Sequence, residues 1–115
     1  MKRRDVYIAN LAPRSGSEQQ GRRPVIIISN DGLNQIQSWR SIIVVPISTS
    51  PAQAKRSLSV LPIPQGVGNL SKDSVALCHQ VATLDRAKFE KFIGTLPAHI
   101  MDEIEQGLKA AMDLS

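Results

Sequence analysis

The sequence predicts a mainly β (α+β) domain, a small barrel of short strands followed by a C-terminal helix. Aromatic residues are scarce, with one Trp, one Tyr and two Phe, so the core must consist chiefly of Val, Ile and Leu. Such β-branched residues pack well on a pleated sheet. Up to Val81, short apolar runs alternate with polar turns, and beyond it the apolar spacing becomes helical. Short antiparallel strands close readily into a barrel, and a length of 115 residues suits a single domain, residues 1–115.

Five strands are expected, at residues 6–11, 24–29, 41–47, 58–63 and 74–81. The second and third are continuous apolar runs, which predicts that both faces of each are buried. Pro46 lies near the end of the third strand and predicts an edge position or the strand's exit from the sheet. In the fifth strand, side chains alternate between faces, so Cys78 is expected in the core and His79 on the opposite face.

Two helices are expected after the strands. Asp85 can cap a short helix over residues 86–92 that Gly94 closes. A longer helix begins near Pro97. Its apolar stripe recurs every four residues, at Ile100, Ile104, Leu108 and Met112. This stripe must pack against the sheet or against a partner.

Charge and cysteine content limit the classes of function. The net charge is +4 and the pI is about 9.6, which favours a polyanionic partner such as nucleic acid, although many soluble proteins carry a few extra lysines. A single cysteine, Cys78, excludes an intramolecular disulfide and suits a reducing compartment. The basic start is not followed by a signal-like apolar region, and no apolar run can span a membrane. A cytoplasmic protein without membrane association is predicted.

The loop before the second strand concentrates side chains that suit phosphate chemistry. Residues 18–24 contain one carboxylate, two amides and two guanidinium groups. Pro24 fixes the backbone directly after Arg23, so Arg23 enters the sheet at a defined place. A guanidinium held in this way can donate several hydrogen bonds to one phosphate and stabilise transition-state charge. The alternative is that Arg22 and Arg23 form only surface ion pairs.

Hydroxyl groups follow the third strand at Ser48, Thr49 and Ser50. If the second and third strands are antiparallel neighbours, the start of one meets the end of the other, and Arg23 lies close to Ser48. A hydroxyl beside an arginine can orient a phosphate oxygen. The alternative is that these residues serve only the turn.

Three further side chains are candidates for nucleic-acid contacts or proton transfer. Histidine is the residue type that most readily moves a proton near neutral pH, which makes His79 a candidate, although a lone histidine is more often structural. The amide of Gln80 can read base edges. Trp39 can stack on a base, form a dimer contact or be partly buried in the core. No metalloprotease, P-loop or dinucleotide motif and no metal-ligand spacing occurs, so neither a metal nor another cofactor is expected.

Together these segments resemble the MazF/PemK/Kid family of toxin endoribonucleases from toxin–antitoxin systems. The similar segments are Asp5–Tyr7, Gly16–Asn30, Val45–Thr49, Leu70–Val75, Cys78–Gln80 and Gly94–Leu96. The second of them is long and specific, whereas the others gain weight from their order and spacing. The resemblance extends over nearly the whole chain.

The resemblance implies an SH3-like β-barrel of about five to seven strands with a C-terminal helix, working as a homodimer. It implies metal-independent, sequence-specific cleavage of single-stranded RNA such as mRNA. In that reaction the ribose 2′-hydroxyl attacks the adjacent phosphate and leaves a 2′,3′-cyclic phosphate and a 5′-hydroxyl. It also implies a cognate antitoxin protein, usually acidic, whose flexible tail lies in the RNA groove.

The resemblance also suggests roles for individual residues. Arg23 matches the family's catalytic arginine, and Ser48 stands where many members have threonine, so the hydroxyl is kept. Glu18 matches a loop carboxylate that is important for activity in some members. Where some members place an arginine and an aspartate as acid and base, this chain has Leu77 and His79, so the proton acceptor stays open between Glu18 and His79. The residues expected to contact RNA are Gln20, Arg22, Thr49 and Gln80.

Two other functions fit parts of the sequence. A related barrel toxin can bind a protein target such as gyrase without cleaving RNA. The length and terminal helix of this chain suit such a toxin equally. A non-catalytic RNA-binding module is permitted by the basic charge alone. The expected pairing of Arg23 with Ser48 favours the nuclease, because a pure binding protein has no need for it.

Overall fold

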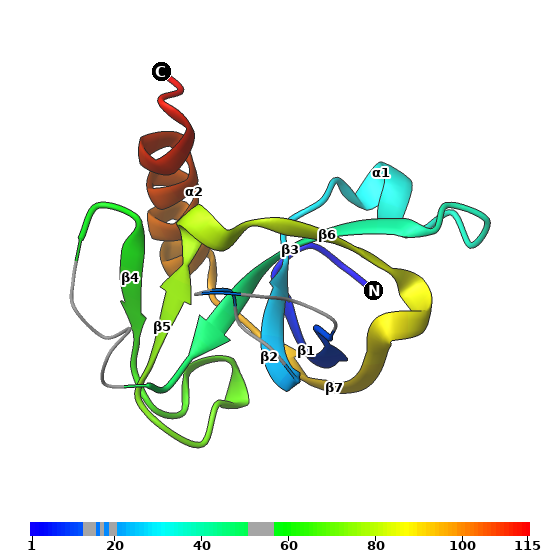
Figure 1. The fold of residues 1–115 in the computed structure, drawn as a ribbon, viewed down its shortest axis with the longest axis horizontal. Coiled ribbons are helices and arrows are strands. Elements are labelled where there is room, and N and C mark those ends of the chain that lie inside the picture. Colours follow the sequence, from blue (N-terminus) through cyan, green and yellow to red (C-terminus); the bar gives the residue numbers. More distant parts are fainter. Residues whose placement is uncertain (13–15, 17, 19–20, 51–56) are drawn as a thin grey trace.

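The computed structural model of the protein describes residues 1–12, 16, 18, 21–50 and 57–115 (Figure 1). The strands in this part of the chain are β1 Asp5–Asn10, β2 Arg22–Ile27, β3 Ser41–Ser48, β4 Val60–Ile63, β5 Ser74–Leu77, β6 Ala82–Asp85 and β7 Phe89–Thr95. The helices are α1 Asp31–Asn34 and α2 Ala98–Met112, with 3-10 segments at Val67–Asn69, Cys78–Gln80 and Arg86–Lys88. None of the helices in the described ranges is long and apolar enough to cross a membrane.

All seven strands belong to one antiparallel sheet, with β3 at its centre. The order is β4-β5-β3-β2-β1-β7, and β6 pairs with β3 beside β5. A short 3-10 segment joins β6 to β7, but the described residues form no β6–β7 ladder. The predicted mainly β fold with a C-terminal helix is therefore confirmed, as a strongly curled sheet that stays open instead of closing into a complete barrel.

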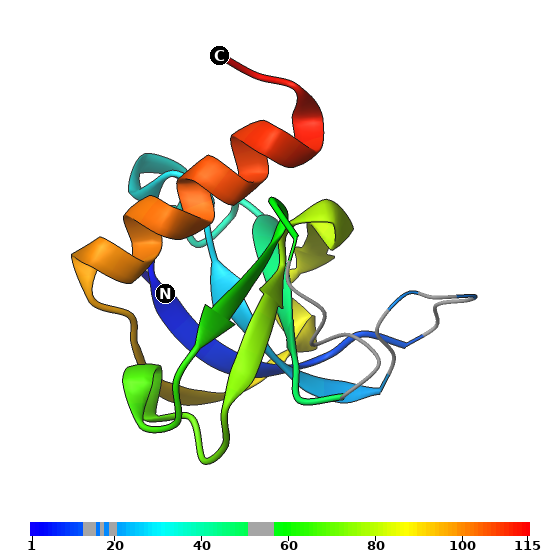
Figure 2. The ribbon, with the colours of Figure 1, turned by 90° about the vertical axis from the view of Figure 1, so that its left-hand side faces the viewer.

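Two apolar clusters lie on opposite faces of the central strands. The larger one includes Val6, Ile26, Val45 and Ile47 and is covered by α2, which packs on β4 and the Cys78–Gln80 segment (Figure 2). The smaller one includes Ala9, Val25, Ile27, Ile42 and Val44. Residues from both clusters alternate along β2 and β3, which confirms the prediction that the apolar runs of these strands are buried on both faces. Of the predicted helix stripe, Ile100, Ile104 and Leu108 are buried, whereas Met112 near the helix end is 48% exposed.

Two expectations about strand ends need correction. The fifth predicted strand stops at Leu77, because Cys78–Gln80 turns into a 3-10 segment under α2, where the Cys78 thiol donates to the Ile104 carbonyl at 3.7 Å. Cys78 is fully buried and His79 exposed, as the alternation predicts. Pro46 lies neither in an edge strand nor at the point where a strand leaves the sheet. It lies where β3 changes partner, between Val44, which pairs with β6, and Ile47, which pairs with β5.

The predicted helix over residues 86–92 is wrong. The chain forms a short 3-10 segment and then strand β7, which contains Gly94 instead of ending before it. Phe89, Phe92 and Ile93 have helical spacing, but pairing with β1 along Asp5–Ala9 overrides this local pattern. Asp85 forms no side-chain cap and instead binds Arg40. Strand β6, which precedes this segment, was not expected either.

Candidate active site

Arg23 and Ser48 lie at the same end of the β2–β3 pair. These strands are antiparallel neighbours with Val25 opposite Pro46, so the hairpin prediction is confirmed. Continuing this register by two residues places Arg23 level with Ser48. Arg23 shares a face of β2 with Val25, and Ser48 shares a face of β3 with Val44, and both valines belong to the smaller cluster. The register therefore brings a guanidinium and a hydroxyl together on one face.

Ser48 is a nearly buried hydroxyl, with only 4% of the residue exposed. Its Oγ accepts the backbone N–H of Ser50 at 3.1 Å. This contact orders the start of the loop and leaves the hydroxyl proton for a ligand, since a serine hydroxyl both accepts and donates. Thr49, the next residue, is exposed.

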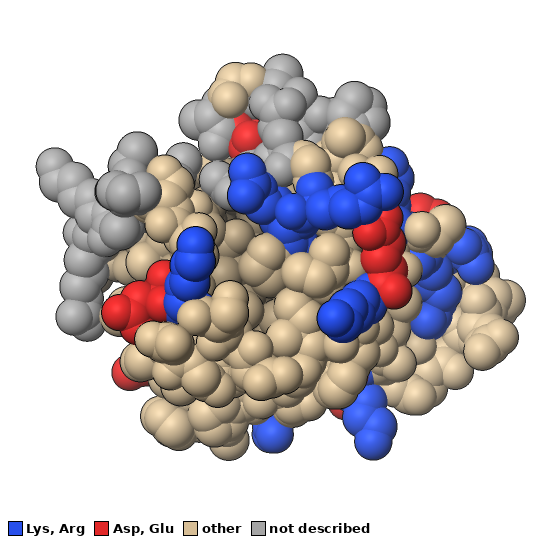
Figure 3. Space-filling model, turned by 90° about the horizontal axis from the view of Figure 1, so that it is seen from below, with Lys and Arg blue, Asp and Glu red and all other residues tan. Residues whose placement is uncertain are grey.

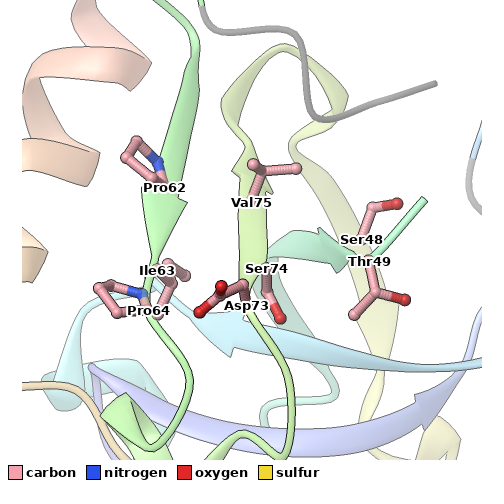
Figure 4. Close-up of a pocket in the computed structure, with 8 residues that line it drawn as sticks. All are labelled: Ser48, Thr49, Pro62, Ile63, Pro64, Asp73, Ser74 and Val75. Atoms are coloured by element: carbon pink, nitrogen blue, oxygen red, sulfur yellow. The ribbon is translucent and has the colours of Figure 1, made fainter. Parts of the chain in front are cut away.

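A hollow of about 420 Å³ opens beside Ser48 and Thr49 (Figure 4). Residues 62–64 of the β4 segment and residues 73–75 at the start of β5 form its other sides. Asp73 accepts the backbone N–H of Gln65 at 2.8 Å, so its carboxylate fastens the turn below the hollow. Sequence reasoning gave no role to Asp73 or Ser74, although both lie within the Leu70–Val75 segment used for the family resemblance.

A second hollow, of about 490 Å³, lies on the other side of Thr49. Thr49 and Ser74 line both hollows, and Pro24, the neighbour of Arg23, lines the second. Lys72, Lys91 and Phe92 complete it, together with Ile8, Asn69, Leu70, Ser71 and Ile93. The two hollows therefore adjoin at Thr49 and Ser74, with Ser48 lining the first and Pro24, the residue after Arg23, lining the second.

The other predicted residues of the first motif lie around this end. Arg22 donates from Nε to Glu90 at 2.8 Å, so it forms the kind of surface ion pair that was the alternative to RNA contact. Arg23 is exposed at the start of β2. Glu18 is exposed in the loop that precedes β2, and Gln20 lies outside the described residues.

His79 and Gln80 are not beside Arg23 and Ser48 within one chain. Val75 pairs with Ser48, and β5 then runs about 7 Å along the strand direction to Leu77, beyond which His79 lies in the 3-10 segment. The His79 ring is exposed, with Nδ1 at 3.4 Å from the Ser59 hydroxyl. Gln80 is half-buried. Trp39 is 42% exposed in the segment between α1 and β3.

The titratable groups with clearly shifted pKa values lie away from the two hollows, except Tyr7. Burial raises the pKa of Tyr7 on β1 and raises the pKa of the Cys78 thiol to about 11. Hydrogen bonding from Arg40 lowers the pKa of Asp85, and the Arg3 backbone N–H lowers that of Asp31. The described residues contain no group of three or more His, Cys, Asp or Glu side chains that is able to hold a metal ion.

A basic, curled antiparallel sheet with a packed terminal helix, and an arginine level with a hydroxyl at one end, defines a small α+β domain suited to a phosphate-bearing ligand. Residues 2–112 match the family described as PemK-like, MazF-like toxin of type II toxin–antitoxin system. The chain belongs to this family, which confirms the resemblance found in the sequence.

Relatives match the sequence of this chain over nearly its whole length. It is 36% identical to "Endoribonuclease MazF" of Staphylococcus epidermidis, over all of this chain and 93% of that protein. It is 37% identical to the protein of the same name in Staphylococcus saprophyticus, over 99% of this chain and 92% of that protein. These names agree with the enzyme class expected from the sequence.

Solved structures share the fold. MazF from Deinococcus radiodurans superimposes with a TM-score of 0.81 at 22% identity, over 99% of this chain and 97% of that one. A mycobacterial structure described as "Endoribonuclease in complex with its cognate antitoxin" gives 0.78 at 19% identity, over 98% and 95%.

Proposed function

We propose that this family member is a toxin endoribonuclease that cleaves single-stranded RNA at specific sequences, without a metal ion, through the Arg23–Ser48 pair. The observation that supports this most directly is the β2–β3 register, which pairs Val25 with Pro46 and, continued by two residues, aligns the backbone positions of Arg23 and Ser48. The two hollows that meet at Thr49 give an RNA strand room on both sides.

The proposed reaction is an internal transesterification. The 2′-oxygen attacks the adjacent phosphorus, the bond from phosphorus to the 5′-oxygen breaks, and a 2′,3′-cyclic phosphate and a 5′-hydroxyl result. The 2′ proton passes to a base, and the leaving 5′-oxygen takes up a proton. Arg23 stabilises the extra negative charge on the phosphate oxygens, and Ser48 donates a hydrogen bond that orients one of them.

The proton acceptor is either Glu18 or His79. Glu18 belongs to the loop that runs into Arg23, whereas His79 lies beyond the end of β5, in the 3-10 segment Cys78–Gln80. This arrangement favours Glu18. The pH dependence of the cleavage rate separates the two candidates: if His79 accepts the proton, the His79→Ala variant loses a titration step near neutral pH. An unchanged profile in that variant excludes the histidine.

The proposal includes the partners that the family implies. A mycobacterial endoribonuclease of this fold is described with its cognate antitoxin. A net charge of +4 suits both RNA and an acidic antitoxin tail. We further propose that the toxin is a homodimer and acts in the cytoplasm, where mRNA is its substrate.

One assay tests the activity against its alternatives. The protein is incubated with a long RNA in the presence of a chelator, and the ends of the products are analysed. We expect cleavage with 2′,3′-cyclic phosphate ends, abolished in Arg23→Ala and unaffected in Arg40→Ala, a matched exposed arginine that pairs with Asp85. No cleavage by the unaltered protein would leave a protein-binding toxin or an RNA-binding module. Cleavage of a substrate that lacks the 2′-hydroxyl at the cut site would exclude the mechanism.

A further inference from the structure

We propose that a surface beside β7, formed by Ile8, Pro24, Lys72, Lys91 and Phe92 and called here the β7 surface, binds a nucleotide that flanks the scissile phosphate. This rests on the proposed function, because it assigns a second subsite to the same single-stranded RNA. The five residues line the hollow of about 490 Å³. At this lower end of the molecule, Lys and Arg side chains, some with Asp or Glu beside them, lie around a mainly uncharged area (Figure 3).

Phe92 provides a platform for a base. The residue is 51% exposed, which is unusual for a phenylalanine. Its ring makes an edge contact with Tyr7, at a centroid distance of 5.5 Å and an interplanar angle of 71°. Tyr7 in turn contacts Phe89 edge-on at 5.8 Å. A ring held in place in this way can stack on any base, because every base has a π-face.

Two lysines provide charge for the phosphates next to that base. Lys72 and Lys91 both line the hollow, and in the described ranges neither ammonium group has an ion-pair or hydrogen-bond partner. Each lysine has an acidic neighbour in sequence. Glu90, next to Lys91, is paired with Arg22, and Asp73, next to Lys72, accepts the Gln65 backbone N–H. In the described part of the chain no ion pair joins either carboxylate to these lysines, and the two ammonium groups favour a polyanion over a neutral or cationic ligand.

The β7 surface begins at Pro24, the residue after Arg23, although the two side chains point to opposite faces of β2. Pro24 pairs with Ile8 on β1, and Ile8 pairs with Lys91 on β7, so these three residues form a row across three strands. Two strand spacings put Lys91 about 10 Å from Pro24, the residue after Arg23. An RNA strand that passes from Arg23 around the start of β2 towards β7 crosses this row.

The backbone that carries Lys72 is held against β7. The Asn69 side-chain amide donates to the Ile93 carbonyl at 3.1 Å. Gly68 and Gly94 approach so closely that a Cβ added to Gly94 would lie 2.6 Å from the Gly68 carbonyl oxygen. The two sides of the hollow are thus fixed relative to each other before any ligand binds, which reduces the ordering that binding requires.

Binding of RNAs of different length tests the proposal. A core oligonucleotide with a 2′-deoxy cut site is compared with versions extended on the 5′ or the 3′ side only. We expect one extension to raise the affinity of the unaltered protein, and Phe92→Leu to weaken binding of that RNA about fivefold or more. The double variant Lys72→Gln/Lys91→Gln should reduce the salt dependence of binding (log K against log salt) by about 1.4. Affinity for the core RNA should stay unchanged in both.

A charge-matched variant, Lys2→Gln/Lys109→Gln, should keep the full gain from the extension. The proposal is overturned if neither extension raises affinity, or if the β7-surface variants keep the whole gain. It is also overturned if these variants weaken binding of a synthetic acidic peptide but not of extended RNA, because the surface then serves a protein partner. A wrong proposed function gives a different result from a wrong subsite. In that case the unaltered protein does not cleave an unmodified core RNA at all.

Discussion

Arginines occupy both ends of the β2–β3 pair, but their surroundings differ. At the end near α1, Arg40 forms an ion pair with Asp85 at 3.1 Å, and Arg86 donates to backbone carbonyls of the connecting segment. These carbonyls belong to Leu33, Asn34, Ile36 and Trp39. At the other end, Arg23 is exposed beside a nearly buried hydroxyl and two hollows. Arginine side chains thus stabilise the fold at the α1 end of the strand pair. At the other end, we infer, an arginine binds a ligand.

The largest expected effect is that of Arg23→Lys on catalysis. Lysine keeps the charge but lacks the planar fork that donates to two phosphate oxygens at once. We expect the single-turnover cleavage rate to fall about 100- to 1000-fold, with the thermal unfolding midpoint unchanged. A lysine variant that cleaves nearly as fast as the unaltered protein would show that charge alone suffices at this end.

Replacement of Ser48 should have a smaller effect at the same end. Ser48→Ala removes one hydrogen-bond donor to the phosphate and should slow cleavage about tenfold. The variant also loses the contact with the Ser50 N–H, which orders the loop. Ser48→Thr keeps the hydroxyl and should restore the rate, which separates the hydroxyl's role from simple packing. Equal rates for the alanine and threonine variants would contradict the assignment.

At the α1 end, Arg86→Ala should alter stability and leave catalysis intact. Removing the guanidinium leaves several carbonyls without their donor, and we expect a loss of about 2 kcal/mol in the free energy of unfolding. Faster amide hydrogen exchange in residues 33–39 should accompany it. The exposed Lys109→Ala variant serves as the reference. A fall in the cleavage rate of folded Arg86→Ala would contradict the proposal that the α1 end stabilises the fold and only the Arg23 end serves catalysis.

The smallest effect concerns the Arg40–Asp85 pair. Hydrogen bonding from Arg40 holds the pKa of Asp85 below 3.8, its ordinary value. The stabilisation from a lowered carboxyl pKa is present above the ordinary value and disappears as the pH falls through the lowered one. NMR titration should show the pKa of Asp85 rising in Arg40→Gln, with little change in stability at neutral pH because both side chains are exposed. An unchanged pKa in that variant would show that the pair does not form in solution.

The sequence predicted the fold best where local pattern and tertiary pairing agree. The apolar runs of β2 and β3 are strands for the expected reason, and their antiparallel pairing follows from their succession in the chain. The pattern failed at β7, where Phe89, Phe92 and Ile93 have helical spacing. Partners far away on β1 determine that segment, and single-sequence periodicity does not contain this information.

The same distinction applies to the candidate site. Arg23 and Ser48 were expected to be neighbours because two consecutive strands carry them. The second hollow was not expected, because Pro24, Lys72 and Lys91 come from three separate parts of the chain. The assignment of Phe92 to a helix also hid its place beside Ile8 and Pro24.

Pro46 has a mechanical consequence for the site. Up to Val44, β3 pairs with β6, and from Ile47 it pairs with β5, so the strand turns from one half of the sheet to the other at this proline. Proline lacks an N–H, so the ladder can divide here without losing a donor. Arg23 is held by the pairing of β2 with β1, whereas Ser48 is held by β5, which pairs with β4 under α2. We therefore expect the spacing of the two groups to depend on how α2 packs on β4, so that a core substitution under this helix lowers the cleavage rate without touching the site.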